Sequence, residues 1–383
     1  MINYGEPTIS NQHIKKVLTV LKKKNITQGD EVENFEISLA KKLKCKYSVV
    51  FSSGTAALHV AGKALGWKKN DIVICTPVTF VASCNSIIYN NASPYFVDID
   101  LKDNNLDCSE LEYHIKLLKQ NRKKIKAVVL TELGGALADW DKIIKLKKKY
   151  NFQILNDKCH SLGSKFKKKV SYSTDFCEIA TVSFHAVKHI TTGEGGAILT
   201  NNKKYYEYSK LLRSHAILKN KKKYSWKYQI NEVGYNYRLT DFQSILGRYQ
   251  LKDLDKKIAE RNKISKFYDL QFKKFPFIKI YKNIKGNLNA RHLYILKIDF
   301  KKFNITKESF FKKVYQYGIK LQQHYIPIYK FNYIKKHCLN FYFKFPKAEI
   351  YNQQSVSLPI HNNLKKKDLS KVVRVIKTIL IPS

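Results

Sequence analysis

One lysine differs from the many others of this chain in its sequence surroundings. A run of β-forming residues leads into Ser183, a short polar turn carries Lys188, and the glycine-rich turn 193–196 returns to the apolar run 197–200. A lysine held between two buried strands is desolvated, and neighbouring cationic groups lower its pKa further. A neutral amine is a nucleophile for a carbonyl. The pattern predicts that Lys188 reacts with an aldehyde or ketone, although most lysines of any chain are solvated surface charges.

Two other predicted strands end in residues suited to binding a charged ring compound. The run 152–156 ends in Asp157, whose carboxylate could hold a proton on a heteroaromatic nitrogen or could simply cap a helix. The run 47–51 is followed by Ser52-Ser53-Gly54-Thr55 and then by a helical pattern. Small residues at a helix N-terminus let backbone N–H groups approach a phosphate, although many such turns bind nothing.

Taken together, these segments predict a site for pyridoxal 5′-phosphate (PLP). Lys188 would bind the cofactor aldehyde as a Schiff base, and Asp157 would keep the pyridine nitrogen protonated. Once a substrate amine has displaced it, Lys188 would be free to move a proton between the substrate carbon and the cofactor. Phe80 could stack on the ring, or it could pack in the core. The predicted phosphate contacts are Gly54, Thr55 and Ser183.

These residues require an α/β fold to bring them together. Between residues 45 and 200, short buried runs alternate with helical patterns, which predicts a mainly parallel sheet with its site at the carboxyl ends of the strands. The predicted strands are 47–51, 72–75, 93–97, 127–131, 152–156, 180–184 and 196–200, and the helices between them include 55–65, 81–90 and 139–149.

The C-terminal third predicts a smaller α/β domain. One long helical pattern, capped by Thr240, runs from residue 240 to 273. A strand at 292–298, a helix at 307–317 and a final helix at 367–380 follow. We therefore expect a large cofactor-binding domain over residues 1–245, and a connecting helix with a small domain over residues 246–383.

The composition limits the other classes of function. The chain has 71 Lys+Arg against 30 Asp+Glu and a net charge of +41, which could serve a nucleic acid or an anionic membrane. The lysine runs at 167–169, 221–223 and 365–367 lack the arginine and aromatic residues of nucleic-acid readers, so nucleic-acid binding is the weaker hypothesis. No apolar run could span a bilayer, and no signal peptide is evident. The seven scattered cysteines predict reduced thiols, and we expect a cytoplasmic protein without a metal site.

Four segments of the sequence together form a specific pattern. They are Thr76-Pro77-Val78-Thr79-Phe80-Val81-Ala82-Ser83, Asp157 with His160-Ser161-Leu162-Gly163, Ser183-Phe184-His185-Ala186-Val187-Lys188 and Glu194-Gly195-Gly196. With these segments the sequence resembles a known family, the DegT/StrS sugar aminotransferases. The similarity runs almost end to end, and the segment around Lys188 is its most specific part.

The resemblance implies fold type I of the PLP enzymes and a homodimer with active sites at the subunit interface. Within the family the chain looks most like the transaminases of pseudaminic acid synthesis. That likeness implies L-glutamate as amino donor and a UDP-linked 4-keto-6-deoxy-N-acetyl-hexose as acceptor, aminated at C4. Other nucleotide keto-sugars, such as a 4-keto-pentose, a perosamine-type sugar or a 3-keto sugar, remain alternatives.

The resemblance also assigns roles to single residues. It implies that His160 lies near the ring hydroxyl and that Asn236 reaches the phosphate side of the partner subunit's site. The residues it implies as substrate contacts are Tyr4, Lys24, Asn25, Ile26, Thr27, His185, Gln322, Gln323, His324 and Tyr325. Tyr4 could instead only pack, and the segment 322–325 could be only a turn.

Two departures from the family pattern matter. The stretch Glu132-Leu133-Gly134-Gly135-Ala136-Leu137-Ala138-Asp139 replaces one in which many relatives carry a His, an aromatic-Gly pair and often a Pro. Because that loop lies near the active site, the choice of acceptor is open. His189 follows Lys188 where relatives often have Asn or Pro.

Overall fold

A seven-stranded sheet forms the centre of the larger part of the chain. The computed structural model describes residues 1–167, 174–219, 226–280, 284 and 286–380. The strand order is β1-β7-β6-β5-β4-β2-β3, and β7 runs antiparallel to the other six strands. This confirms the predicted mainly parallel sheet. The strands are β1 Tyr47–Phe51, β2 Ile72–Cys75, β3 Ser93–Phe96, β4 Ile125–Thr131, β5 Gln153–Asp157, β6 Ile179–Ser183 and β7 Gly196–Thr200.

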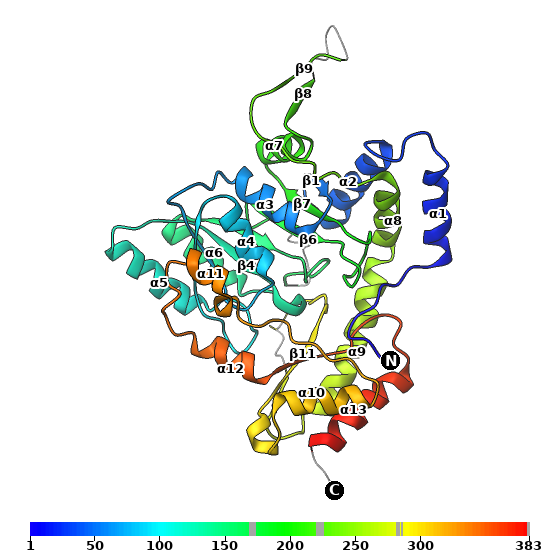
Figure 1. Cartoon of the computed structure of the whole chain (residues 1–383), viewed down its shortest axis with the longest axis vertical. Helices are drawn as coiled ribbons and strands as arrows, with labels where there is room; N and C mark the ends of the chain where they lie inside the picture. The colour runs from blue at the N-terminus through cyan, green and yellow to red at the C-terminus, as the bar shows by residue number, and fades with distance from the viewer. Residues whose placement is uncertain (168–173, 220–225, 281–283, 285, 381–383) are drawn as a thin grey trace.

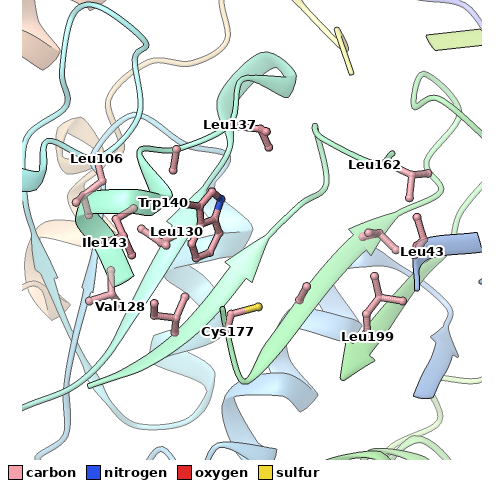
Figure 2. Close-up of a cluster of buried hydrophobic side chains, with 14 of the residues drawn as sticks. Leu43, Leu106, Val128, Leu130, Leu137, Trp140, Ile143, Leu162, Cys177 and Leu199 are labelled. Carbon is pink, nitrogen blue, oxygen red and sulfur yellow. The ribbon is translucent and has the colours of Figure 1, made fainter. Parts of the chain in front are cut away.

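Helices cover both faces of this sheet because its strands are apolar on both sides. In β4, Val128 and Leu130 pack in one core cluster with Trp140 (Figure 2), whereas Ala127 and Val129 belong to a second cluster on the opposite face. The helices of this part are α1 Asn11–Leu21, α2 Asp30–Leu43, α3 Gly54–Ala64, α4 Val81–Tyr89, α5 Cys108–Gln120, α6 Trp140–Tyr150 and α7 Lys203–Arg213.

A long helical segment connects the large sheet to the C-terminal part (Figure 1). The prediction of one helix over residues 240–273 is wrong: the segment consists of α8 Asp241–Lys252 and α9 Leu254–Phe272. They are separated at Asp253, whose N–H bonds to the carbonyl of Gln250 rather than continuing the four-residue ladder. The predicted cap is confirmed, since the Thr240 hydroxyl accepts from the Gln243 N–H.

The C-terminal part is built around a three-stranded antiparallel sheet with its own core. Its strands are β10 Ile278–Lys279, β11 Tyr294–Ile298 and β12 Ser355–Leu358, and its helices are α10 Lys307–Gln316 and α13 Lys366–Leu380. The buried residues of α11 Asn332–His337 and α12 Pro346–Gln354 instead join a core cluster of the large sheet. The chain also returns to the large sheet, where the Leu339 N–H donates to the Pro94 carbonyl. The predicted domain boundary after residue 245 falls inside α8 and stays a prediction.

A two-stranded hairpin, β8 Ile217–Lys219 and β9 Tyr228–Ile230, projects beyond α7 (Figure 1). Of the predicted surface lysine runs, 221–223 and residues 168–169 of the run 167–169 lie outside the described residues. Lys365–Lys367 is exposed where α13 begins. The seven cysteines carry free thiols, as predicted. Within the described ranges, no helix has the length and apolar character needed to cross a bilayer.

Candidate active site

A cavity of about 570 Å³ lies at the carboxyl ends of the parallel strands, where the sequence predicts the site. Segments far apart in the sequence line it, from the N-terminus to the stretch before α11. The predicted site residues among its walls are Tyr4, Gly54, Thr55, Phe80, Asp157, Ser183, His185, Lys188, Gln322, Gln323, His324 and Tyr325.

Lys188 enters the cavity from the connection between β6 and β7. This connection is closed at its base, where the Phe184 N–H donates to the Gly195 carbonyl and the Thr192 N–H donates to the Phe184 carbonyl. Burial lowers the pKa of the Lys188 amine to about 8, with Cys159 and Asp157 opposing the shift and Arg261 adding to it. A lysine with this pKa is partly neutral near pH 7 and can act as a nucleophile.

A group of buried histidines surrounds this amine. The Nζ of Lys188 lies 3.5 Å from Nε2 of His292, and the His292 ring lies 4.6 Å from that of His160 and 5.7 Å from that of His189. Burial lowers the pKa of all three histidines well below the ordinary value, and the positive charge of Lys188 contributes. The three rings are therefore neutral around the lysine.

Arg261 of α9 ties the Lys188 connection to the C-terminal part. Its fully buried guanidinium donates to the carbonyls of Ile360 at 2.9 Å, His292 at 3.2 Å and Val187 at 3.5 Å. Burial lowers its pKa to about 10. The carbonyl of the residue before Lys188 and two carbonyls just outside β11 and β12 thus share one cation.

Asp157 is the last residue of β5, and its carboxylate is held rigidly. Its Oδ2 accepts from the Ser83 hydroxyl at 2.6 Å, and its Oδ1 accepts from the Cys159 N–H at 3.1 Å. The Ser83 hydroxyl also bonds to Thr79 at 2.9 Å, and Thr79 bonds to Thr131 at 3.0 Å. A fixed, charge-assisted acceptor of this kind suits a protonated ring nitrogen.

The turn between β1 and α3 brings a helix N-terminus to the same cavity. Ser53 caps α3 by accepting from the Ala56 N–H at 3.0 Å. Gly54 lies so close to Ser183 that a Cβ on it would be 3.0 Å from the Ser183 Cβ. Glycine therefore lets the helix N-terminus and the Ser183 hydroxyl reach the same volume, which suits a phosphate.

The aromatic wall of the cavity comes from Phe80 and Tyr325. Phe80 is 53% exposed, which excludes core packing within this chain, and its ring lies 5.6 Å from that of Tyr325. His160 lies behind this wall: it is buried, does not line the cavity, and its Nε2 lies 3.2 Å from the Tyr325 hydroxyl. A direct contact of His160 with the cofactor ring stays a prediction.

Most of the predicted substrate contacts also line the cavity. Tyr4 packs its ring 5.3 Å from that of His324, whose Nδ1 lies 2.9 Å from the Ser357 hydroxyl. The side-chain amide of Gln323 is already bonded to Lys307 and Asn352. Gln323 is therefore held by the protein. The side-chain oxygen of Gln322 accepts from the Gln323 N–H at 2.9 Å.

Two groups of predicted residues lie outside this cavity within the single chain. Lys24, Asn25, Ile26 and Thr27 are exposed and pack beside the start of α8, where the Asp241 N–H donates to the Ile26 carbonyl. Asn236 is exposed and pairs through its backbone with Ser214. Contacts of these residues with a ligand across a subunit interface stay predictions.

Several residues of this site were not predicted from the sequence. Ser83 and Cys159 hold the Asp157 carboxylate, and no local sequence pattern indicates that contact. His292 and Arg261 received no prediction, because their proximity to Lys188 depends on how α9 and β11 pack on the large sheet. Glu194 lines the cavity from the turn after Lys188, a position that the glycine-rich pattern could have indicated.

The residues present fit a phosphorylated pyridine aldehyde. Lys188 supplies an amine of lowered pKa, Asp157 supplies a fixed carboxylate, and the Ser53–Thr55 turn with Ser183 supplies donors for a phosphate. Gly54 provides the close approach that a phosphate cradle needs, since a side chain there would be in tight contact with Ser183.

Comparisons with known proteins agree with this chemistry. The profile of the DegT/DnrJ/EryC1/StrS aminotransferase family matches residues 7–377. The UDP-4-amino-4,6-dideoxy-N-acetyl-beta-L-altrosamine transaminase of Campylobacter jejuni subsp. jejuni serotype O:23/36 (strain 81-176) is 37% identical over 381 residues, which cover 99% of this chain and 98% of that protein.

The solved structures that are similar to this chain are also aminotransferases. Helicobacter pylori PseC, an aminotransferase involved in the biosynthesis of pseudoaminic acid, matches with a TM-score of 0.91 and 31% identity over 99% of both chains. The putative sugar aminotransferase Spr1654 of Streptococcus pneumoniae has been solved in PMP and PLP forms. Its PMP form matches this chain with a TM-score of 0.89 and 26% identity over 99% of both chains. The chain is therefore a member of the DegT/DnrJ/EryC1/StrS aminotransferase family, whose cofactor is PLP.

Proposed function

We propose that this protein transfers an amino group from L-glutamate to C4 of a UDP-linked 4-keto-6-deoxy-N-acetyl-hexose, in nucleotide-sugar biosynthesis of the pseudaminic acid type. One observation carries the proposal. The Lys188 amine and the Asp157 carboxylate face the same cavity, in a chain that aligns over 99% of its length with a transaminase of this sugar class.

The cofactor supplies an electrophilic carbonyl and a pyridine ring that withdraws electrons from the carbon next to the reacting nitrogen. Asp157 would hold a proton on the pyridine nitrogen. Its carboxylate is already oriented by the Ser83 hydroxyl at 2.6 Å and by the Cys159 N–H at 3.1 Å, so binding requires little reorganisation.

Lys188 supplies both the attachment point and the proton carrier. Because burial lowers the pKa of its amine to about 8, Nζ can take a proton from the substrate carbon and return it near neutral pH. The neutral ring of His292, 3.5 Å from Nζ, keeps a polar group within reach of the amine when it is not bound to the cofactor.

The phosphate would be held by the α3 N-terminus with the hydroxyls of Thr55 and Ser183. Phe80, which lines the cavity with more than half of its side chain exposed, would pack on one face of the ring. Tyr4, His185 and the segment 322–325 form the remaining wall and would contact the substrates.

We propose a homodimer in which Asn236 of one subunit completes the site of the other. The exposure of Asn236 away from its own cavity supports this arrangement. Lys188→Ala and Asn236→Ala dimers should each be impaired. A 1:1 mixture that has exchanged subunits should regain about a quarter of wild-type activity, because about half of its dimers are mixed and each mixed dimer has one intact site out of two. No recovery on mixing would contradict a shared site.

A panel of keto-sugars tests the choice of acceptor. The protein, PLP and L-glutamate are incubated with UDP-, GDP- and dTDP-linked keto-sugars, and amino-sugar products are identified by mass spectrometry and NMR. We expect the UDP-linked 4-keto-6-deoxy-N-acetyl-hexose to give the highest kcat/KM. Preferred turnover of a GDP-linked or a 3-keto sugar would establish another member of the same reaction class.

The charge of +41 motivates a different class, a nucleic-acid-binding protein on this scaffold. Salt-dependent nanomolar binding of DNA or RNA by a protein inactive on every keto-sugar would support that class. A binding protein has no need of Lys188 or Asp157, so we favour the enzyme. We place it in the cytoplasm, where nucleotide sugars and glutamate are available.

A further inference from the structure

A short hydrogen-bonded chain runs from the loop after β4 to the cavity. The Gly134 N–H donates to Nδ1 of His160 at 3.3 Å, and Nε2 of His160 lies 3.2 Å from the hydroxyl of Tyr325. Gly134 belongs to the stretch that departs from the family pattern, and Tyr325 lines the cavity. These hydrogen bonds therefore connect that stretch of the loop to the site through a buried histidine.

The fold fixes the position of Gly134, the first donor in this series of hydrogen bonds. Gly134 has φ +65°, and its carbonyl accepts from the N–H groups of His292 at 3.0 Å and Leu293 at 3.2 Å. The next residue, Gly135, lies so close to Ala290 that a Cβ on it would be 1.7 Å from the Ala290 carbonyl oxygen. The Gly134 N–H therefore has one direction available, toward His160.

This N–H determines which nitrogen of His160 carries the proton. A backbone N–H can only donate, so Nδ1 of His160 must accept, and the proton of the neutral ring must be on Nε2. Burial lowers the pKa of His160 well below its ordinary value, and Lys188 adds to this, so the doubly protonated ring is excluded near neutral pH. Nε2 of His160 is consequently a donor to the Tyr325 oxygen.

The tautomer in turn determines what Tyr325 offers to the cavity. Its oxygen accepts from His160, so its own O–H needs a different acceptor, and no other protein acceptor is shown in the part of the chain that the structure describes. Burial raises the pKa of Tyr325, and the charge of Asp157 raises it further. The hydroxyl therefore keeps its proton at working pH.

We propose that Tyr325 is a fixed hydrogen-bond donor to a ligand oxygen in the cavity, with its direction set by Gly134 through His160. The inference rests on the proposed function and adds one specific contact to it. The matching ligand group is a negatively charged oxygen, because a charged acceptor makes the stronger bond. Two groups have this chemistry: the ring hydroxyl oxygen of the cofactor and the carboxylate of the amino donor.

Tyr325→Phe removes the donor and keeps the ring. If the cofactor oxygen is the acceptor, the variant should bind PLP about 10-fold more weakly and should bind 3-deoxypyridoxal 5′-phosphate as the wild type does. If the donor carboxylate is the acceptor, PLP affinity should be unchanged and KM for glutamate should rise about 10-fold. The matched control is Tyr329→Phe, which removes a hydroxyl that donates to Glu349 at 2.5 Å and does not line this cavity. Equal behaviour of the two variants in both measurements would overturn the proposal.

Two His160 variants test the positioning. In His160→Gln the amide oxygen can accept from Gly134 and the amide N–H can donate to Tyr325, whereas His160→Leu can do neither. We expect the glutamine variant to stay near wild type and the leucine variant to lose about as much as Tyr325→Phe. Equal losses in both, with thermal unfolding unchanged, would show that His160 does not act through its hydrogen bonds.

NMR of protein with 15N-labelled histidine reads the tautomer directly, without any ligand. We expect His160 to be neutral and protonated at Nε2 at pH 7. A ring protonated at Nδ1, or a charged ring, would overturn the proposal even if the enzyme is active. If the protein fails to bind PLP, the proposed function fails. The tautomer measurement still decides the direction of the hydrogen bonds from Gly134 to Tyr325.

Discussion

Replacement of Lys188 by methionine should make the protein without cofactor more stable. Methionine has a similar length but no charge, so it removes a buried ammonium group whose solvation was lost on folding. The pKa of Lys188 is about 8 in the folded protein, against an ordinary value of 10.5. The unfolded chain therefore binds the proton more tightly than the folded chain does.

The size and the pH dependence of the effect follow from these two values. Since each pH unit corresponds to about 1.4 kcal/mol, the charge on Lys188 lowers the free energy of unfolding by about 3 kcal/mol below pH 8. Between pH 8 and 10.5 the folded state has released the proton and the unfolded state still binds it, so stability rises with pH. The advantage of Lys188→Met should be complete near pH 7 and should disappear as the pH approaches 10.5.

Urea unfolding of wild type and variant at pH 7, 8, 9 and 10, at one protein concentration and without PLP, measures this difference. Lys312→Met, at an exposed position of α10, is the matched control and should show no comparable pH-dependent gain. A Lys188→Met protein that is less stable than wild type at pH 7, or an advantage that is the same at pH 7 and pH 10, would refute the reasoning. The amine would then not be the partly neutral nucleophile that the mechanism requires.

Two other substitutions test the geometry of the site and its support. Ser83→Ala removes a 2.6 Å bond to Asp157, which is worth about 1.5–3 kcal/mol for a charged acceptor. We expect kcat/KM to fall about 10- to 100-fold in steady-state assays; a fall of less than twofold would contradict the role of the pair. Gly135→Ala should destabilise the protein by several kcal/mol or prevent folding, because its Cβ would overlap the Ala290 carbonyl. Gly193→Ala is the control: it is also at positive φ but has open space around it, so thermal unfolding should show a cost of only about 1–2 kcal/mol. Equal costs for the two variants would show that the loop at Gly135 can move to accommodate a side chain.

The parallel sheet could be predicted because its strands are short apolar runs between helical patterns. Runs 47–51, 72–75 and 196–200 match β1, β2 and β7 residue for residue. Asp157 and Lys188 could be predicted to share a cavity, since both follow strands whose carboxyl ends meet at one edge. This part of the site depends on strand direction, which local sequence patterns reveal.

The rest depends on packing between distant segments. His292 precedes β11 and has no neighbour in the sequence that links it to Lys188, yet its ring lies 3.5 Å from that amine. The break between α8 and α9 at Asp253 could not be predicted either, because no Gly or Pro lies at that position. His160 was predicted beside the cofactor from a motif, but its position relative to the cavity depends on Tyr325, which is distant in the sequence.

The single guanidinium of Arg261 restricts how this enzyme can be re-engineered. It belongs to α9, and its acceptors are the carbonyl of Val187, one residue before the reactive lysine, two carbonyls of the small-sheet region and the side chain of Asn362. A chimaera that exchanges the C-terminal half with a relative, in order to change the accepted sugar, would also alter the support of the cofactor lysine. Grafts should therefore keep this arginine together with all four of its acceptors.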